Sequence, residues 1–179
     1  MSNAEEVQKL LGAQEIGHLK SRYCRYIDTK QWEALRTIFA AEARFEGFVA
    51  APNGSGVREF VDGVSRRLAN SVTVHHCHMP EIVFLTSDSA RAVWAMMDYC
   101  EWPTPIALPE APKARGFSGY GYYEEEYRRI DGTWKIQFVR LTRQRVDPLV
   151  EGPNPARAGS LALSAEWTAP SRDWLNSVA

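Results

Sequence analysis

The chain has 179 residues, 45% of them hydrophobic and 24% charged, which is ordinary for one soluble globular domain with a substantial core. Its formal net charge is only -1, so we expect no nucleic-acid or membrane partner, because both are held largely by positive charge. No basic segment followed by an apolar run opens the chain, and no apolar run could span a bilayer, so a cytoplasmic protein is expected. The three cysteines lack CxxC spacing and are predicted to be reduced and mostly buried.

The first seventy residues have mainly helical patterns. Apolar residues recur every three to four positions from Ala4 to Thr29, which predicts an amphipathic helix. The same spacing predicts a second, short helix from Trp32 to Phe39. A short strand is expected over residues 43–48, and a third helix from Val57 to Leu68 follows a loop rich in turn residues.

After Asn70 the pattern becomes that of β-strands. Strands are predicted at about 71–85, 90–102, 116–130 and 133–146. Short turns join the first two strands and the last two, whereas a long proline-rich connection separates the two pairs. Three helices before a meander of long strands predict an α+β fold, with a curved sheet that leaves room for a pocket.

The last part of the chain has a different composition. From Asp147 onward Pro, Gly, Ala and Ser dominate, yet Trp167 and Trp174 are too apolar for a purely disordered tail. We therefore predict a domain over residues 1–147 and a tail over 148–179. The tail is expected to pack on the body or on a partner subunit.

Three of the four histidines lie together at the start of a predicted strand, as His75, His76 and His78. Near neutral pH, histidine is the side chain best suited to proton transfer. Along a strand, His75 points to one face, while His76 and His78 point to the other. A metal site built from this run is therefore not expected, because its ligands would not converge on one point.

Several motifs, in this order, resemble the SnoaL-like branch of the nuclear transport factor 2-like superfamily over about residues 8–147. They are residues 26–32 with Leu35 and Phe39, residues 43–45, the pair His75-His76 before residues 82–84, and residues 127–136. The resemblance implies a cone-shaped α+β barrel, with about three helices packed in a strongly curved, mainly antiparallel sheet. It also implies homodimers or homotrimers that associate through the outer face of the sheet.

Within the superfamily the chain looks most similar to the dehydratase-like group, which includes scytalone dehydratase, bile-acid 7α-dehydratase and hexachlorocyclohexane dehydrochlorinase. In that group an aspartate at the end of the first helix partners a histidine that removes the substrate proton. By motif position these residues are Asp28 and His75. The dehydrochlorinase also has an arginine on its last strand, for which the nearest match is Val139. Arg140 lies one residue further, on the other strand face.

The resemblance also implies that the strand face of Trp94, Met96 and Asp98 lines the pocket. The candidate substrate-binding residues are Phe45, Phe60, Trp94, Met96 and Tyr123. Asp98 shares a strand face with Trp94 and Met96, and it is either a second acid–base group or the salt-bridge partner of an arginine such as Arg140. Tyr23 and Tyr123 are the preferred hydroxyl donors.

These residues predict a cofactor-independent acid–base lyase of the dehydratase type. His75, oriented by Asp28, would remove a proton from a small, apolar and ring-containing substrate, while Tyr23, Tyr123 or Asp98 assists the leaving group. Isomerisation or cyclisation on the same dyad is an open alternative. A second alternative is a non-catalytic subunit or ligand-binding module, such as the small subunit of a ring-hydroxylating dioxygenase. In that case side chains would fill the pocket.

Overall fold

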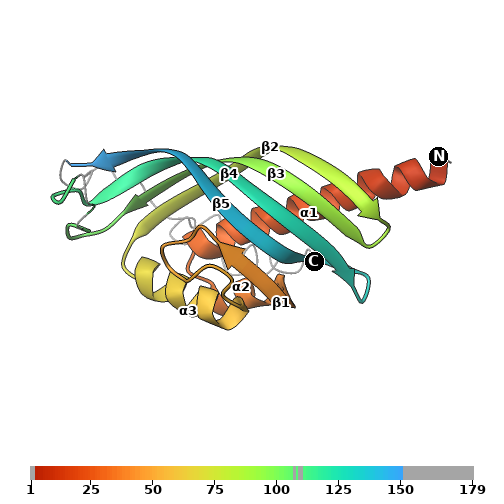
Figure 1. The fold of residues 1–179 in the computed structure, drawn as a ribbon, viewed down its shortest axis with the longest axis horizontal. Coiled ribbons are helices and arrows are strands. Elements are labelled where there is room, and N and C mark those ends of the chain that lie inside the picture. Colours follow the sequence, from red (N-terminus) through yellow and green to blue (C-terminus); the bar gives the residue numbers. More distant parts are fainter. Residues whose placement is uncertain (1–2, 107, 109–110, 151–179) are drawn as a thin grey trace, which may run out of the picture.

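The computed structural model describes residues 3–106, 108 and 111–150. Its helices are α1 (Asn3–Asp28), α2 (Trp32–Thr37) and α3 (Val57–Leu68), drawn in Figure 1. The three predicted helices are confirmed, with one difference at the end of α2. Phe39 was expected to be helical but begins a strand, because its backbone pairs with Ile136 of the last strand.

Five strands form one mixed sheet in the order β1-β5-β4-β3-β2. β1 (Phe39–Glu46) pairs in parallel with β5, and all other neighbours are antiparallel. The four strands predicted after Asn70 are confirmed as β2 (Val72–Thr86), β3 (Ser89–Glu101), β4 (Gly116–Ile130) and β5 (Thr133–Leu149). The sheet is unclosed, because β1 and β2 are its two edges. The predicted α+β class with a curved, mainly antiparallel sheet is confirmed.

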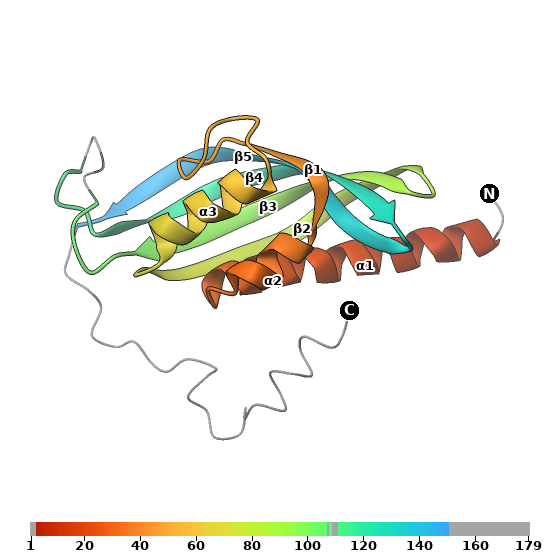
Figure 2. The same cartoon turned by 90° about the horizontal axis from the view of Figure 1, so that it is seen from below.

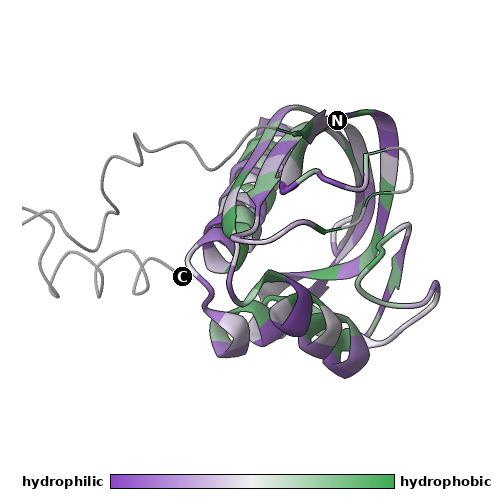
Figure 3. Cartoon of the chain, turned by 90° about the vertical axis from the view of Figure 1, so that its left-hand side faces the viewer, coloured by the Kyte–Doolittle hydropathy of each residue, from purple (hydrophilic) through white to green (hydrophobic). Residues whose placement is uncertain are grey.

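The sheet is long and curved, and the helices pack against one side of it (Figure 2). α1 lies alongside β2. The first turns of this helix project beyond the sheet, where Val7 and Leu10 are exposed (Figure 1). Seen end-on in Figure 3, the sheet bends strongly, and hydrophobic and hydrophilic residues alternate along its strands. This alternation is expected of strands that bury one face and expose the other.

An aromatic cluster fills the core where α1, α3 and β1 meet. Phe45 stacks on Phe60 with ring centroids 3.8 Å apart. Phe39 meets these two rings edge-on at 4.9 and 6.0 Å, and Tyr23 of α1 packs edge-on against Phe39 at 6.2 Å. Each such pair contributes about 0.5–1.5 kcal/mol beyond its buried area. The cluster holds α3 and α1 together and forms one wall of the candidate site.

The C-terminal end of the fold differs slightly from the predicted domain boundary. β5 continues to Leu149, two residues past position 147. The predicted packing of the tail, with Trp167 and Trp174, lies outside the described residues. Within the part of the chain that the structure describes, no helix has both the length and the apolar character needed to cross a bilayer.

Candidate active site

Asp28, the last residue of α1, and His75 of β2 are in direct contact. The Asp28 Oδ1 atom lies 2.6 Å from Nδ1 of His75, and Oδ2 accepts a hydrogen bond of 2.8 Å from the His75 backbone N–H. Because a carboxylate can only accept, the Nδ1 atom of His75 donates, which leaves Nε2 as the unprotonated nitrogen of the neutral ring. The spatial pairing expected from the motif positions is therefore present.

Two further residues, Thr73 and Lys30, orient Asp28. The Thr73 hydroxyl donates to Asp28 Oδ1 at 2.9 Å, and the Lys30 ammonium donates to the same hydroxyl at 2.9 Å. Lys30 has a left-handed backbone (φ 60°), which turns the chain just after α1 ends. Burial lowers the pKa of Lys30, while the Asp28 carboxylate opposes that effect. These donors compensate for placing a carboxylate at a helix C-terminus, where the helix dipole disfavours it.

Asp98 of β3 lies directly opposite His75 in the β2–β3 register. Both of its oxygens accept hydrogen bonds from the Arg143 guanidinium of β5, at 2.7 and 2.5 Å. Arg143 reaches Asp98 across β4 at Gly119, where a Cβ atom would come within 2.3 Å of Asp98 and 1.9 Å of Arg143. A bidentate pair of this kind needs the carboxylate form of Asp98, and this favours the salt-bridge alternative over a proton donor.

The prediction that Arg140 pairs with Asp98 was wrong. Arg140 lies on the outer face of the sheet and pairs with Glu46 at 2.9 Å. The inward face of β5 runs through Val139 and Leu141, both buried, so the next inward position is Arg143. Counting in steps of two from Val139 would have found it. Arg143 is the main site residue that the sequence analysis did not name.

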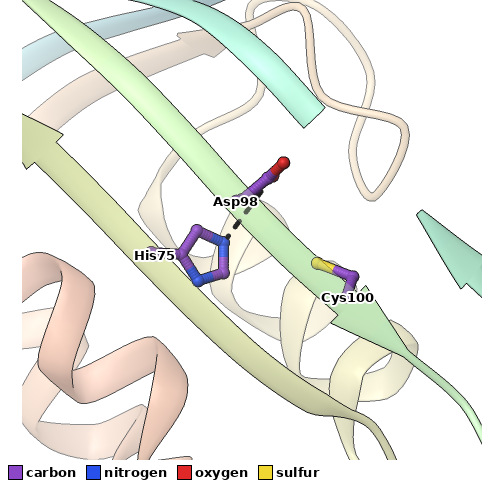
Figure 4. Close-up of side chains that lie close together, drawn as sticks. All are labelled: His75, Asp98 and Cys100. Atoms are coloured by element: carbon purple, nitrogen blue, oxygen red, sulfur yellow. Dashed lines mark ion pairs between the residues drawn. The ribbon is translucent and has the colours of Figure 1, made fainter. Parts of the chain in front are cut away.

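The Nε2 atom of His75 faces Asp98 at 4.0 Å, beyond hydrogen-bond distance (Figure 4). Cys100 completes a group whose possible ligand atoms all lie within 4.8 Å of one another. A metal ion here would have to compete with Arg143 for Asp98. Burial raises the pKa of the Cys100 thiol to about 12, so the thiol of the metal-free protein is neutral.

An apolar cavity of about 190 Å³ opens beside this group. His75, Asp98, Arg143, Tyr23 and Tyr123 all line it. Burial raises the pKa of Tyr23 and of Tyr123 well above the usual value, so both hydroxyls remain protonated and able to donate. The rest of the lining is mainly apolar and aromatic, and it includes Phe48, Phe60, Leu68, Trp102, Phe117 and Leu141.

Three of the five predicted lining residues do not line this cavity. Phe45 lies behind Phe60, on which it stacks. Trp94 and Met96 share the inner face of β3 with Asp98 but belong to the buried core, where the Trp94 indole N–H donates to the Tyr127 hydroxyl at 2.9 Å. Strand alternation identified the correct face, but it could not indicate how far the cavity extends along that face. Phe60 and Tyr123 do line the cavity.

Comparisons with known proteins agree with this architecture. The sequence profile of the SnoaL-like domain family matches residues 8–140. Among characterised sequences, the "Probable cyclase FGR4" of Gibberella zeae is 22% identical over 138 residues, which is 72% of this chain and 88% of that protein.

Two solved structures are similar over almost their whole length. A hexachlorocyclohexane dehydrochlorinase, LinA type 2, has a TM-score of 0.70 at 19% identity, covering 85% of this chain and 99% of the other. A scytalone dehydratase candidate from Novosphingobium aromaticivorans DSM 12444 has a TM-score of 0.68 at 18% identity, with coverages of 87% and 99%. At such identities the likeness establishes the fold. Since the family profile spans most of the sequence, the chain belongs to the SnoaL-like domain family, as its motifs predicted.

Proposed function

We propose that the protein is a cofactor-independent lyase in which His75 acts as a general base and Asp28 orients it. The observation that carries this proposal is the 2.6 Å contact between Asp28 Oδ1 and His75 Nδ1, in a histidine that lines the cavity and whose opposite ring nitrogen lies 4.0 Å from Asp98. The named relatives support the same class of chemistry, because they comprise a probable cyclase, a scytalone dehydratase candidate and a dehydrochlorinase.

In the proposed reaction, Nε2 of His75 takes a proton from an acidified carbon of the substrate. The imidazolium that forms is stabilised by Asp28 at Nδ1 and by the Asp98 carboxylate, which lies 4.0 Å from Nε2. Arg143, although paired with Asp98, lines the cavity together with Tyr23 and Tyr123. These three side chains would stabilise negative charge on an enolate or on a departing anion.

The cavity limits the substrate that the site could take. Its volume of about 190 Å³ and its aromatic walls suit a small, apolar, ring-containing molecule. Among the lining residues, His75, Asp98 and Arg143 lie together, because Asp98 pairs with Arg143 and lies 4.0 Å from Nε2 of His75. The substrate should therefore present its acidic C–H bond and its oxygen or halogen substituent to this group.

Isomerisation or cyclisation on the same base is the second candidate reaction, and the similarity to a probable cyclase favours it. In that case the proton taken by His75 returns to another carbon and no group leaves. A non-catalytic subunit is a weaker explanation, because side chains do not fill the cavity beside the dyad.

A substrate screen can test the proposal. Cyclic β-hydroxyketones and halogenated cyclohexanes would be incubated with the protein in D₂O, and the products followed by NMR and mass spectrometry. Elimination removes water or hydrogen halide, whereas isomerisation incorporates deuterium without that loss. With any compound that reacts, His75→Ala should lower turnover by about 10²–10⁴-fold, the usual contribution of a general base.

The matched control is His76→Ala, since His76 is exposed on the opposite face of the same strand. This variant should retain the turnover of the unmodified protein. If the folded His75→Ala variant turned the substrate over as fast as the unmodified protein, the assignment of His75 as the base would be wrong.

A further inference from the structure

Two thiols meet at the contact between α1 and β2. Cys24 and Cys77 are both free cysteines, and Cys24 Sγ donates a hydrogen bond to Cys77 Sγ at 3.5 Å across 53 residues of sequence. Cys24 lies one helical turn before Asp28, and Cys77 lies two residues after His75 on the same strand face. The thiols therefore connect the two elements that carry the candidate dyad, while neither cysteine lines the cavity.

The two thiols differ in exposure and in acidity. Cys77 is partly exposed, whereas Cys24 is buried. The hydrogen bond from Cys24 lowers the pKa of the Cys77 thiol, and the positive charge of Lys20 acts in the same direction. That hydrogen bond raises the pKa of Cys24 well above its usual value. The less buried of the two cysteines is thus also the one whose thiol ionises more easily, as expected of an attacking cysteine beside a resolving one.

We propose that Cys24 and Cys77 form an oxidation site, at which a small peroxide converts the two thiols into an intramolecular disulfide. The Cys77 thiolate attacks one peroxide oxygen, so that an S–O bond forms, the O–O bond breaks and hydroxide leaves. The sulfur of Cys24 then attacks the Cys77 sulfenic acid, forming the S–S bond. The hydroxyl group leaves with the Cys24 proton as water. The two thiols together lose two electrons, and the peroxide is reduced to water.

The disulfide would affect the neighbourhood of the dyad. The two sulfur atoms must move from 3.5 Å to about 2.05 Å apart. This movement would draw α1 toward β2 one helical turn from Asp28 and two residues from His75. The new bond would also close a chain loop from residue 24 to residue 77, which restricts the unfolded chain and should raise the unfolding temperature.

The test is peroxide treatment of the full-length protein, followed by mass spectrometry without a reducing agent. The intact mass should decrease by two hydrogen atoms. After trypsin digestion, the peptide of residues 23–25 should be linked to that of residues 68–91. Oxidised protein should also unfold at a higher temperature than reduced protein, and dithiothreitol should reverse both changes.

Cys100 provides the matched control, because it is buried with a pKa of about 12. Cys100→Ser should still form the cross-link, whereas Cys24→Ser should accumulate oxygen adducts on Cys77 instead. Three results with the unmodified protein would overturn the proposal. They are unlinked peptides after peroxide treatment, a link to the Cys100 peptide of residues 92–113, and a disulfide between two chains. None of these readouts depends on the proposed enzymatic activity.

Discussion

One buried and one partly buried polar network lie inside this fold, and they differ in whether they reach the cavity. In the first, Lys20 of α1 donates to Glu125 of β4, which also accepts a hydrogen bond from Tyr127. The Lys20 ammonium lies 4.2 and 3.7 Å from the ring centroids of Tyr23 and Tyr123. Both charged side chains are essentially inaccessible, at 1% and 0% exposure. We call this network closed, because its two charges pair with each other and neither is exposed.

The second network joins Lys30, Thr73, Asp28 and His75 in sequence, and it is open. Its final atom is Nε2 of His75, which lies 4.0 Å from Asp98, and both residues line the cavity. The comparison shows that a buried charge alone does not identify a reactive site. A network that ends in an unprotonated nitrogen beside a cavity has an atom that can still accept a proton from a substrate.

The largest expected effect on stability comes from breaking the closed network. Lys20→Met leaves the Glu125 carboxylate buried without its cation, which should lower the free energy of unfolding by about 3–5 kcal/mol. Urea denaturation measures this loss. The double variant Lys20→Met/Glu125→Leu removes both charges and should recover most of it. If the single variant were as stable as the unmodified protein, the network would not be closed as described.

Gly119→Ala tests the Asp98–Arg143 pair without removing either charge. A Cβ atom at this position would lie 1.9 Å from Arg143 Nη1 and 2.3 Å from Asp98 Oδ1, so at least one of these side chains must shift. Overpacking of this kind should lower the free energy of unfolding by about 1–3 kcal/mol.

The control for this substitution is Gly17→Ala, on α1. Nothing lies within 4 Å of a Cβ atom at residue 17, so alanine should raise the free energy of unfolding by about 0.5–1 kcal/mol through its higher helix propensity. Equal effects of the two substitutions would contradict the geometry of the pair.

Thr73→Val should have the smallest effect on stability but a clear effect on the open network. Valine keeps the shape of threonine and removes the hydroxyl that links Lys30 to Asp28. Two hydrogen bonds are lost, and the one that reaches the dyad is the bond to Asp28. That bond is worth about 0.5–1.5 kcal/mol, so turnover of a substrate found in the screen should decrease by up to roughly tenfold. A large KM change with constant kcat would instead indicate a role in substrate binding.

Much of the fold could be predicted because its elements are long and strongly periodic. The alternation of β2 placed His75 and His76 on opposite faces, and the resemblance paired His75 with Asp28 across the sequence. Both expectations agree with the geometry. The boundaries of the four long strands were predicted to within three residues, since turn residues flank them.

Other parts depend on how distant strands and helices pack. Arg143 was missed because its partner lies two strands away and is reached only across Gly119. Lys20 and Glu125 resemble surface charges in the sequence, although α1 and β4 bury them against each other. Trp94 and Met96 were assigned to the cavity because the resemblance indicated their strand face, and a strand face does not show where the core ends.

The central claim is that Asp28 holds His75 with Nε2 free to accept a proton. Nitrogen-15 NMR of the histidine rings tests this directly and needs no substrate. Near neutral pH, the uncharged ring of His75 should carry its proton on Nδ1, and Asp28→Asn should weaken that preference. A neutral His75 ring protonated on Nε2 would contradict the account, because it would leave no base facing the cavity.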